Sequence, residues 1–214
     1  MRIILLGAPG VGKGTQAKLI AKEFNVCHIS TGEMFRAEIA KGSNLGKISK
    51  EYMDKGDLVP DEITTQIIGE RLKCDDCSNG FLLDGFPRTT AQAEALDKLL
   101  NEENKTLDKV VLINVKDDII LERIIGRRTC KQCGTNYHIK FNPSKLKEKC
   151  ESCGGDLTQR EDDKEEVVTE RLVQYNKLTQ PLIAYYNNKN LLSSVDGTLS
   201  VDEVFHEISS LLIS

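Results

Sequence analysis

The chain has 214 residues, of which 39% are hydrophobic and 29% are charged. This length is enough for one well-buried core, and this composition excludes a disordered chain. The 29 Lys and Arg residues against 33 Asp and Glu residues give a formal net charge of −4, which argues against a general nucleic-acid binder, because such proteins are usually basic.

The N-terminal apolar run is stopped early by Gly and Pro, so it is too short for a signal peptide or a membrane span. We therefore expect a cytoplasmic protein without a membrane partner. In that reducing compartment, the seven cysteines are expected to stay unpaired or to bind metal.

Short apolar runs alternate with stretches of helical periodicity. The expected strands are Arg2–Leu6, Val26–Ile29, Phe81–Asp84, Val110–Val115 and Leu191–Val195. The expected helices are Lys13–Phe24, Asp61–Lys73, Thr90–Asn101, Asp117–Gly126 and Val201–Leu212. Continuous apolar runs are typical of strands buried on both faces, so this alternation predicts an α/β fold with a parallel sheet covered by helices. Binding sites are then expected at the carboxyl ends of the strands.

Two segments interrupt the alternation and are interpreted as insertions. Ser30–Val59 has its own helical pattern, opened by Ser30-x-x-Glu33, which predicts a capping box. Gly126–Asp163 contains four cysteines and lacks long periodicity. A later helix, Glu165–Tyr186, contains Pro181, so a kink or break is expected there.

A glycine-rich turn directly follows the first expected strand. Gly7-x-x-x-x-Gly12-Lys13 fits the motif G-x-x-x-x-G-K-[ST] through its lysine. Glycines let backbone N–H groups surround phosphate oxygens, and the helix that begins here adds the positive end of its dipole. The usual hydroxyl position holds Gly14, and the hydroxyl comes one residue later at Thr15. We predict a loop that binds a nucleoside triphosphate through Gly10, Val11, Gly12, Lys13, Gly14 and Thr15.

Further stretches of the chain resemble the adenylate kinases. They are "GAPGVGKGTQ" (Gly7–Gln16), "STGEMFR" (Ser30–Arg36), "LVPDE" (Leu58–Glu62), "GFLLDGFPRT" (Gly80–Thr89), "RIIGRR" (Arg123–Arg128) and "QREDD…V…RL" (Gln159–Leu172). All occur in the family's order. The resemblance implies a P-loop NTPase-like three-layer sandwich with a five-stranded parallel sheet. It divides the chain into a core (residues 1–29, 60–125 and 164–214), a mobile NMP-binding insertion (30–59) and a mobile lid (126–163).

The resemblance also implies reversible phosphoryl transfer from MgATP to AMP, giving two ADP, by a monomer that serves adenine nucleotide homeostasis and salvage. It assigns AMP binding to Thr31, Arg36, Asp57, Leu58, Val59, Gly85, Phe86, Pro87, Arg88, Gln92, Arg160 and Arg171. It adds Arg123, Arg127, Asn136, Tyr137 and Leu199 to the phosphate loop as ATP-binding residues. Arginine suits phosphate because its guanidinium is a permanently charged fork, and a glutamine amide can both donate to and accept from a base edge.

The same resemblance assigns the transfer step to Lys13, Asp84, Arg88, Arg123, Arg160 and Arg171. Asp84 would hold water ligands of Mg²⁺, which is consistent with the missing hydroxyl after the lysine. The accepting phosphate has a second pKa of about 6 and is already mostly anionic, so alignment and charge neutralisation replace a general base. Asp162 and Asp163 resemble lid carboxylates that pair with arginines. Arginines from separate elements can surround one phosphoryl group only when the lid closes.

The cysteines of the lid have metal-ligand spacing. Cys130-x2-Cys133-x16-Cys150-x2-Cys153 matches C-x2-C-x15–20-C-x2-C. Four thiolates complete a tetrahedron and leave no open position, so a structural Zn²⁺ is expected, although iron accepts the same ligands. Cys27, Cys74 and Cys77 are interpreted as free thiols.

Two other functions are compatible with these motifs. A kinase for UMP, CMP or GMP would use the same phosphate loop, although Thr31 and Gln92 favour AMP. A zinc-ribbon nucleic-acid binder attached to an NTPase would also contain the four cysteines, but the acidic net charge opposes it.

Overall fold

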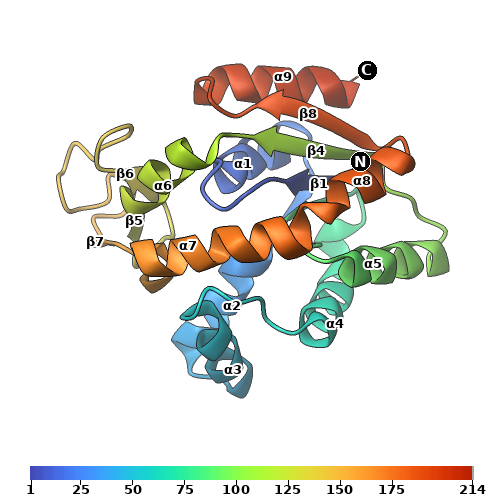
Figure 1. Ribbon diagram of the computed structural model, residues 1–214, viewed down its shortest axis with the longest axis horizontal. Helices are drawn as coiled ribbons and strands as arrows, with labels where there is room; N and C mark the ends of the chain where they lie inside the picture. The colour runs from blue at the N-terminus through green and yellow to red at the C-terminus, as the bar shows by residue number, and fades with distance from the viewer. Residues whose placement is uncertain (214) are drawn as a thin grey trace.

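The computed structural model describes residues 1–213, and its centre is a parallel sheet with helices on both faces (Figure 1). The strands are β1 (Arg2–Leu6), β2 (Cys27–Ser30), β3 (Phe81–Asp84), β4 (Lys109–Asn114) and β8 (Leu192–Asp196). Within residues 1–213 this sheet has five strands in the order β2-β3-β1-β4-β8, and every neighbouring pair is parallel. The predicted α/β class and five-stranded parallel sheet are therefore confirmed.

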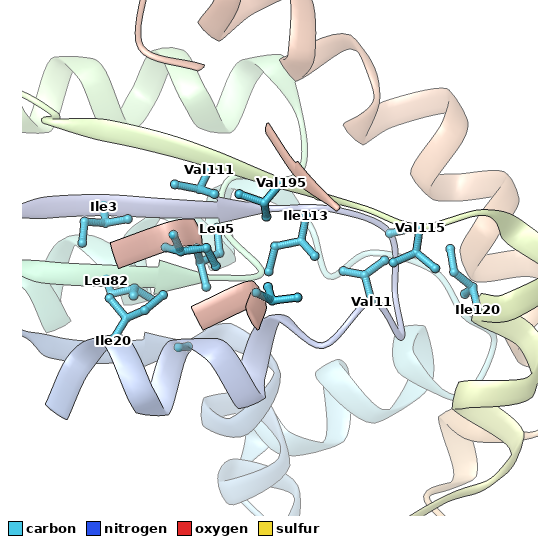
Figure 2. Close-up of a cluster of buried hydrophobic side chains, with 14 of the residues drawn as sticks. Ile3, Leu5, Val11, Ile20, Leu82, Val111, Ile113, Val115, Ile120 and Val195 are labelled. Carbon is cyan, nitrogen blue, oxygen red and sulfur yellow. The ribbon is translucent and has the colours of Figure 1, made fainter. Parts of the chain in front are cut away.

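Two hydrophobic clusters, one on each face of the sheet, form the core. Ile3 and Leu5 of β1 belong to one cluster, and Ile4 and Leu6 belong to the other, because successive side chains of a strand point to opposite faces. Figure 2 shows the first cluster, which packs against α1 (Lys13–Glu23), α6 (Asp117–Ile125) and α9 (Val201–Ile213). The second cluster packs against α4 (Asp61–Leu72), α5 (Thr90–Glu102) and α8 (Pro181–Asn188). Both faces are buried, which explains the uninterrupted apolar runs of the sequence.

The first insertion (residues 30–59) consists mainly of α2 (Thr31–Lys41) and α3 (Asn44–Met53), which project away from the sheet (Figure 1). The capping box expected at its start is wrong. Ser30 does precede α2, but its side chain makes no capping hydrogen bond. Ser30 is also the last residue of β2, paired with Asp84, and is buried. Glu33 instead lies 3.4 Å from the ammonium of Lys18 in α1.

The lid segment (residues 126–163) contains a small antiparallel sheet that its sequence pattern did not indicate. Its strands are β5 (Arg127–Cys130), β6 (Asn136–His138) and β7 (Leu157–Thr158), in the order β6-β5-β7. They are too short to give a periodic pattern. Cys130, Tyr137 and Cys150 form a separate buried cluster under this sheet.

The helix expected over Glu165–Tyr186 is interrupted, as the proline predicts. It consists of α7 (Glu165–Gln174), a π-helical segment (Tyr175–Thr179) and α8, which has Pro181 in its first turn. Proline lacks an N–H and crowds the carbonyl group four residues earlier, so the regular helix already ends at residue 174. The two remaining short helices are η1 (Asp75–Cys77) and η2 (Glu161–Asp163).

No helix within residues 1–213 combines the length and the apolar character that crossing a bilayer would require.

Candidate active site

The glycine-rich loop connects the carboxyl end of β1 to the amino end of α1. Gly12 precedes α1 with a φ of 102°, in the left-handed region that favours glycine. A Cβ on Gly10 would come within 2.4 Å of the Ile124 side chain in α6. The loop backbone therefore packs against α6, and its N–H groups and the amino end of α1 are available for an anion.

Lys13 lies over this loop. Its Nζ donates hydrogen bonds to the carbonyl oxygens of Gly7 (2.7 Å) and Ala8 (2.8 Å). Burial lowers the pKa of Lys13 to about 7; Asp84 acts in the opposite direction, and Arg88 adds to the lowering. A phosphate oxygen beside Nζ would favour the charged ammonium.

Asp84 ends β3 next to the phosphate loop. A Cβ on Gly14 would lie 3.4 Å from its Oδ2, so the carboxylate occupies the region beside the usual hydroxyl position of the motif. The Nε2 atom of His28 lies 3.7 Å from the same oxygen, which is too far for a hydrogen bond. Burial opposes ionisation of Asp84, but the nearby His28, Lys13 and Arg88 outweigh burial and lower its pKa. Asp84 is therefore a carboxylate at neutral pH.

Two connected pockets open at the carboxyl ends of the strands. The first pocket lies between the first insertion and β3; among its lining residues are Thr31, Phe35, Arg36, Met53, Asp57, Leu58, Val59, Thr64, Gly85, Arg88, Gln92, Asp162 and Arg171. The main cleft runs from the phosphate loop to the lid segment; among its lining residues are Gly10, Val11, Gly12, Lys13, Gly14, Thr15, Asp84, Pro87, Arg123, Arg127, Asn136, Tyr137, Arg160 and Leu199. Arg36, Gly85, Arg88 and Arg171 border both. A group bound in one pocket can therefore meet a group bound in the other.

Positive charge dominates these walls. Among the described residues that line the two pockets, the seven cations are Lys13, Arg36, Arg88, Arg123, Arg127, Arg160 and Arg171. The carboxylates there are Glu33, Asp57, Asp84 and Asp162. This excess of three positive charges, in a chain with a net charge of −4, marks the walls as an anion site.

Arg88 is positioned where the first pocket meets the main cleft. Its Nε donates to the carbonyl oxygen of Gly85 at 2.8 Å. Burial, reinforced by the neighbouring Arg171, lowers the pKa of Arg88 to about 10. The guanidinium is thus buried among like charges, which an anion would offset.

Gln92 is 2% exposed, although its position in a helix would ordinarily be exposed. Its Oε1 accepts from the backbone N–H of Arg88 (2.7 Å), and its Nε2 donates to Asp61 Oδ1 (2.7 Å). Thr89 donates to the other oxygen of Asp61 at 2.7 Å. Asp61 therefore fixes the amide orientation. We did not assign this role from the sequence, although Asp61 stands within the quoted "LVPDE" motif.

Thr31 lies opposite Gln92 in the first pocket. Its hydroxyl donates to the carbonyl oxygen of Gly85 at 2.9 Å. Phe35 and Met53 also line this pocket, and nothing in their sequence context distinguished them from core residues. The side chain of Phe86, another residue expected at the AMP site, is 1% exposed in the core and lines neither pocket.

The arginines of the lid side are held by protein groups. Arg127 binds both oxygens of Asp163, with Nε at 2.8 Å from Oδ2. Arg171 donates to the backbone oxygen of Asp162 (2.7 Å) and lies 3.1 Å from its carboxylate. Asp162 and Asp163 therefore pair with arginines.

Two further arginines of this side contact uncharged groups. Arg160 donates to Thr129 Oγ1 (2.9 Å) and Asn136 Oδ1 (2.8 Å). Arg123 donates to the carbonyl oxygen of Gly197 (2.8 Å), two residues before Leu199. Asn136, expected to approach ATP, thus also positions Arg160.

Four sulfur atoms gather in the lid segment. The Sγ atoms of Cys130, Cys133, Cys150 and Cys153 all lie within 4.8 Å of one another. Sγ–Sγ distances are 3.4 Å for Cys130–Cys153 and 3.5 Å for Cys133–Cys150. A tetrahedral site with metal–sulfur bonds of about 2.3 Å has edges of roughly 3.8 Å, so the cluster fits one metal ion.

The fold and the cleft define a class: a phosphate-loop kinase whose acceptor carries an anion in a second, arginine-bordered pocket. A model of the adenylate kinase family matches residues 5–191. The chain belongs to the adenylate kinase family.

Close relatives extend this match to nearly the whole chain. The chain is 58% identical over 212 residues to an adenylate kinase of Clostridium botulinum (strain Loch Maree / Type A3), covering 99% of this chain and 98% of that protein. It is 56% identical over 212 residues to an adenylate kinase of Clostridium tetani, with 99% and 98% coverage. With an adenylate kinase of Clostridium novyi it shares 55% identity over 210 residues, with 98% and 97% coverage.

Proposed function

We propose that the protein catalyses reversible transfer of the γ-phosphoryl group from MgATP to AMP, giving two ADP, in adenine nucleotide homeostasis and salvage. The observation that carries this proposal is the junction of the two pockets at Arg36, Arg88 and Arg171, next to the phosphate loop. Membership in the adenylate kinase family supports the choice of nucleotides.

In this proposal the first pocket holds AMP. Arg36 and Arg88 bind its phosphate, and Gln92 and Thr31 face the adenine together with the backbone at residues 57–59. Asp61 holds the Gln92 amide in one orientation, so that the base meets a fixed donor and acceptor. This fixed orientation then selects adenine over other bases. An amide that could flip freely would exchange its donor and its acceptor, and so would bind either arrangement of donor and acceptor on a base edge.

The main cleft holds ATP. The phosphate loop and Lys13 bind the β- and γ-phosphates, and Arg123, Arg127, Arg160 and Arg171 neutralise the charge that develops during in-line transfer. Asp84 would hold water ligands of Mg²⁺, and Gly14 leaves room beside the carboxylate. Bound Mg²⁺ would supply charge neutralisation on the phosphate oxygens. No phosphoenzyme is involved.

Closure of two insertions completes the site. We assign residues 1–29, 60–125 and 164–214 to the core, residues 30–59 to the NMP-binding insertion and residues 126–163 to the lid. Both insertions contribute cations to the cleft, so their approach would surround the phosphates and exclude water that could otherwise hydrolyse ATP.

The metal of the lid would be Zn²⁺ in a structural role. Four thiolates leave no open coordination position, so the metal stabilises the lid and takes no part in bond breaking. Removing it with a chelator, with excess Mg²⁺ present, is expected to lower the melting temperature far more than it lowers phosphotransfer measured in the cold. Immediate loss of activity with an unchanged melting curve would contradict this role.

We further propose a cytoplasmic monomer without nucleic-acid partners. The excess positive charge is confined to the cleft, and the chain as a whole is acidic. A salt-dependent gel shift of DNA or RNA at submicromolar protein would contradict this part of the proposal.

The function is tested by measuring ADP formation from ATP with AMP, UMP, CMP or GMP as acceptor. We expect kcat/KM to be highest with AMP. Lys13→Met should lower phosphotransfer by several kcal/mol of transition-state stabilisation, of the order of 10²–10³-fold. A preference for another monophosphate would reject the assignment of AMP, and near-normal transfer by Lys13→Met would reject the role of the phosphate loop.

A further inference from the structure

A second group of metal-ligating side chains lies at the end of the sheet opposite to the cleft. Cys27 begins β2, whereas Ser30 at the other end of that strand leads into the first insertion. Asp76 and Cys77 belong to η1, the short turn between α4 and β3. The sequence analysis interpreted Cys27, Cys74 and Cys77 as free thiols, and the fold brings Cys77 close to Cys27.

The spacing of these groups suits a metal ion. The ligand atoms of Cys27, Asp76 and Cys77 all lie within 4.8 Å of one another. Cys27 Sγ is 3.4 Å from Asp76 Oδ2, and Cys77 Sγ is 3.8 Å from Asp76 Oδ1. These edges match the 3.4 and 3.5 Å sulfur–sulfur distances of the lid cluster.

A cation already lies among the three ligands. The Arg71 guanidinium, from the last turn of α4, places Nη1 at 2.8 Å from Asp76 Oδ1 and 3.1 Å from Cys77 Sγ. Its Nη2 lies 2.6 Å from Asp76 Oδ2 and 2.9 Å from Cys27 Sγ. The side chain of Arg71 is 27% exposed, so it has a path to solvent.

We propose that Cys27, Cys77 and Asp76 form a second metal site, for a thiophilic divalent cation such as Zn²⁺ or Cd²⁺, in which the metal takes the place of the Arg71 guanidinium. Binding releases two thiol protons. The net charge with the metal bound is then zero, summed over two thiolates, one carboxylate, the divalent ion and Arg71. The net charge without the metal is also zero, summed over two thiols, Asp76 and Arg71. Water would complete the tetrahedron, and Arg71 would keep contact with the outer carboxylate oxygen.

Oxidation to a Cys27–Cys77 disulfide is the competing chemistry for this pair. It requires a thiolate to attack the oxidant, yet burial raises the pKa of Cys27 to about 12 and also raises that of Cys77. A metal ion brings its own positive charge and deprotonates the thiols that it binds. A raised thiol pKa also opposes the deprotonation that metal binding requires, so the geometry of the three ligands, and not thiol acidity, favours coordination.

The location predicts what the metal would do. It would join the start of β2, the strand that leads into the first insertion, to the turn between α4 and β3. The phosphate loop is at the other end of the strands, so binding should raise stability and leave the chemical step unchanged.

Equilibrium dialysis of the reduced protein against Zn²⁺, followed by metal analysis, tests the proposal. We expect two zinc ions per wild-type chain and one in Cys27→Ser and Cys77→Ser, the remaining one being held by the lid cysteines. Cys74→Ser is the matched control and should keep two, because its thiol is exposed and outside the cluster. Arg71→Met should tighten the second site at least tenfold, since the metal no longer displaces a cation.

Cys77 is buried, so a folding defect in its variant is checked against Asp76→Asn, an exposed position where we expect at least tenfold weaker binding of the second ion. One zinc per wild-type chain, or two in both Cys27→Ser and Asp76→Asn, would overturn the proposal. So would a Cys27–Cys77 disulfide, detected by mass spectrometry in protein kept under thiol reductant.

Discussion

The arginines on the two sides of the cleft are stabilised in different ways. On the side of the first pocket, where we propose that AMP binds, the side chain of Arg36 makes no hydrogen bond or ion pair with any residue of the described range 1–213, and the side chain of Arg88 donates only to the main-chain oxygen of Gly85 within that range. On the lid side, Arg127 and Arg171 pair with Asp163 and Asp162. One side thus leaves its cations for the ligand, and the other neutralises them within the protein.

The pKa values follow this difference at Arg88 and Arg127, but not at Arg171, where burial outweighs Asp162 and lowers the pKa. Burial lowers the pKa of Arg88 to about 10, whereas the hydrogen-bonded Asp163 outweighs burial at Arg127 and raises its pKa. Arg160, which is held by neutral groups, has a pKa lower than that of Arg88: burial and the nearby Arg127 lower it to about 9. The comparison teaches that changes on the side of the first pocket should act mainly on catalysis, and changes to Asp162 and Asp163 mainly on stability.

The largest effect is expected from Asp163→Asn. Asp163 is fully buried, and its loss leaves Arg127 as an uncompensated buried cation, which costs about 3–5 kcal/mol of the free energy of unfolding. Urea denaturation measures this loss. Glu161→Gln is the control from the same turn, because its carboxylate is exposed and pairs only with Lys164. Equal stability of the two variants would break the comparison on the lid side.

Arg88→Ala should act on catalysis instead. Without the guanidinium between the two pockets, kcat/KM for ATP plus AMP is expected to fall 10²–10³-fold, about 3–4 kcal/mol of transition-state stabilisation. Its melting temperature should stay the same or rise, because a buried cation without a carboxylate partner is removed. Arg128→Ala is the matched control, since Arg128 donates to main-chain oxygens and lines neither pocket. A stability loss as large as that of Asp163→Asn would erase the distinction.

The smallest effect is expected at low pH. Burial opposes ionisation of Asp162, but Arg171, Arg36, Arg127 and Arg160 outweigh it and lower its pKa. Its folded-state pKa is therefore below the unfolded value, so the stabilisation is present above about pH 4 and is lost as the pH falls through the folded pKa. Urea midpoints between pH 5 and pH 3 should fall less steeply for Asp162→Asn than for the wild type. Parallel curves would mean that Arg171 does not stabilise this carboxylate.

The sequence predicted the sheet well because its strands are buried on both faces and therefore read as continuous apolar runs. Local sequence patterns predicted the structure less well where contacts between distant parts of the chain determine it. Ser30 had the sequence of a capping box, but its position at the end of β2 left its side chain without a capping bond. The strands of the lid segment are two to four residues long, too short for any periodicity.

The candidate site also contains residues that a local motif predicts and residues that only contacts between distant parts of the chain bring together. The phosphate loop is a local motif, so Lys13 and its glycines could be predicted from spacing alone. Gln92 depends on Asp61, which is 31 residues away in sequence, and no local pattern predicts that contact. Likewise, Cys27 and Cys77 meet only because β2 and η1 are neighbours in the fold.

The unequal distribution of charge has a consequence for how nucleotides reach the enzyme. Subtracting the excess of three positive charges in the cleft from the net charge of −4 leaves −7 for the rest of the chain. Most of the surface therefore repels an approaching polyanion, and field lines converge on the opening of the cleft. The electric field therefore guides diffusing nucleotides toward the cleft. Their association should slow as salt shortens the Debye length to about 8 Å at physiological ionic strength.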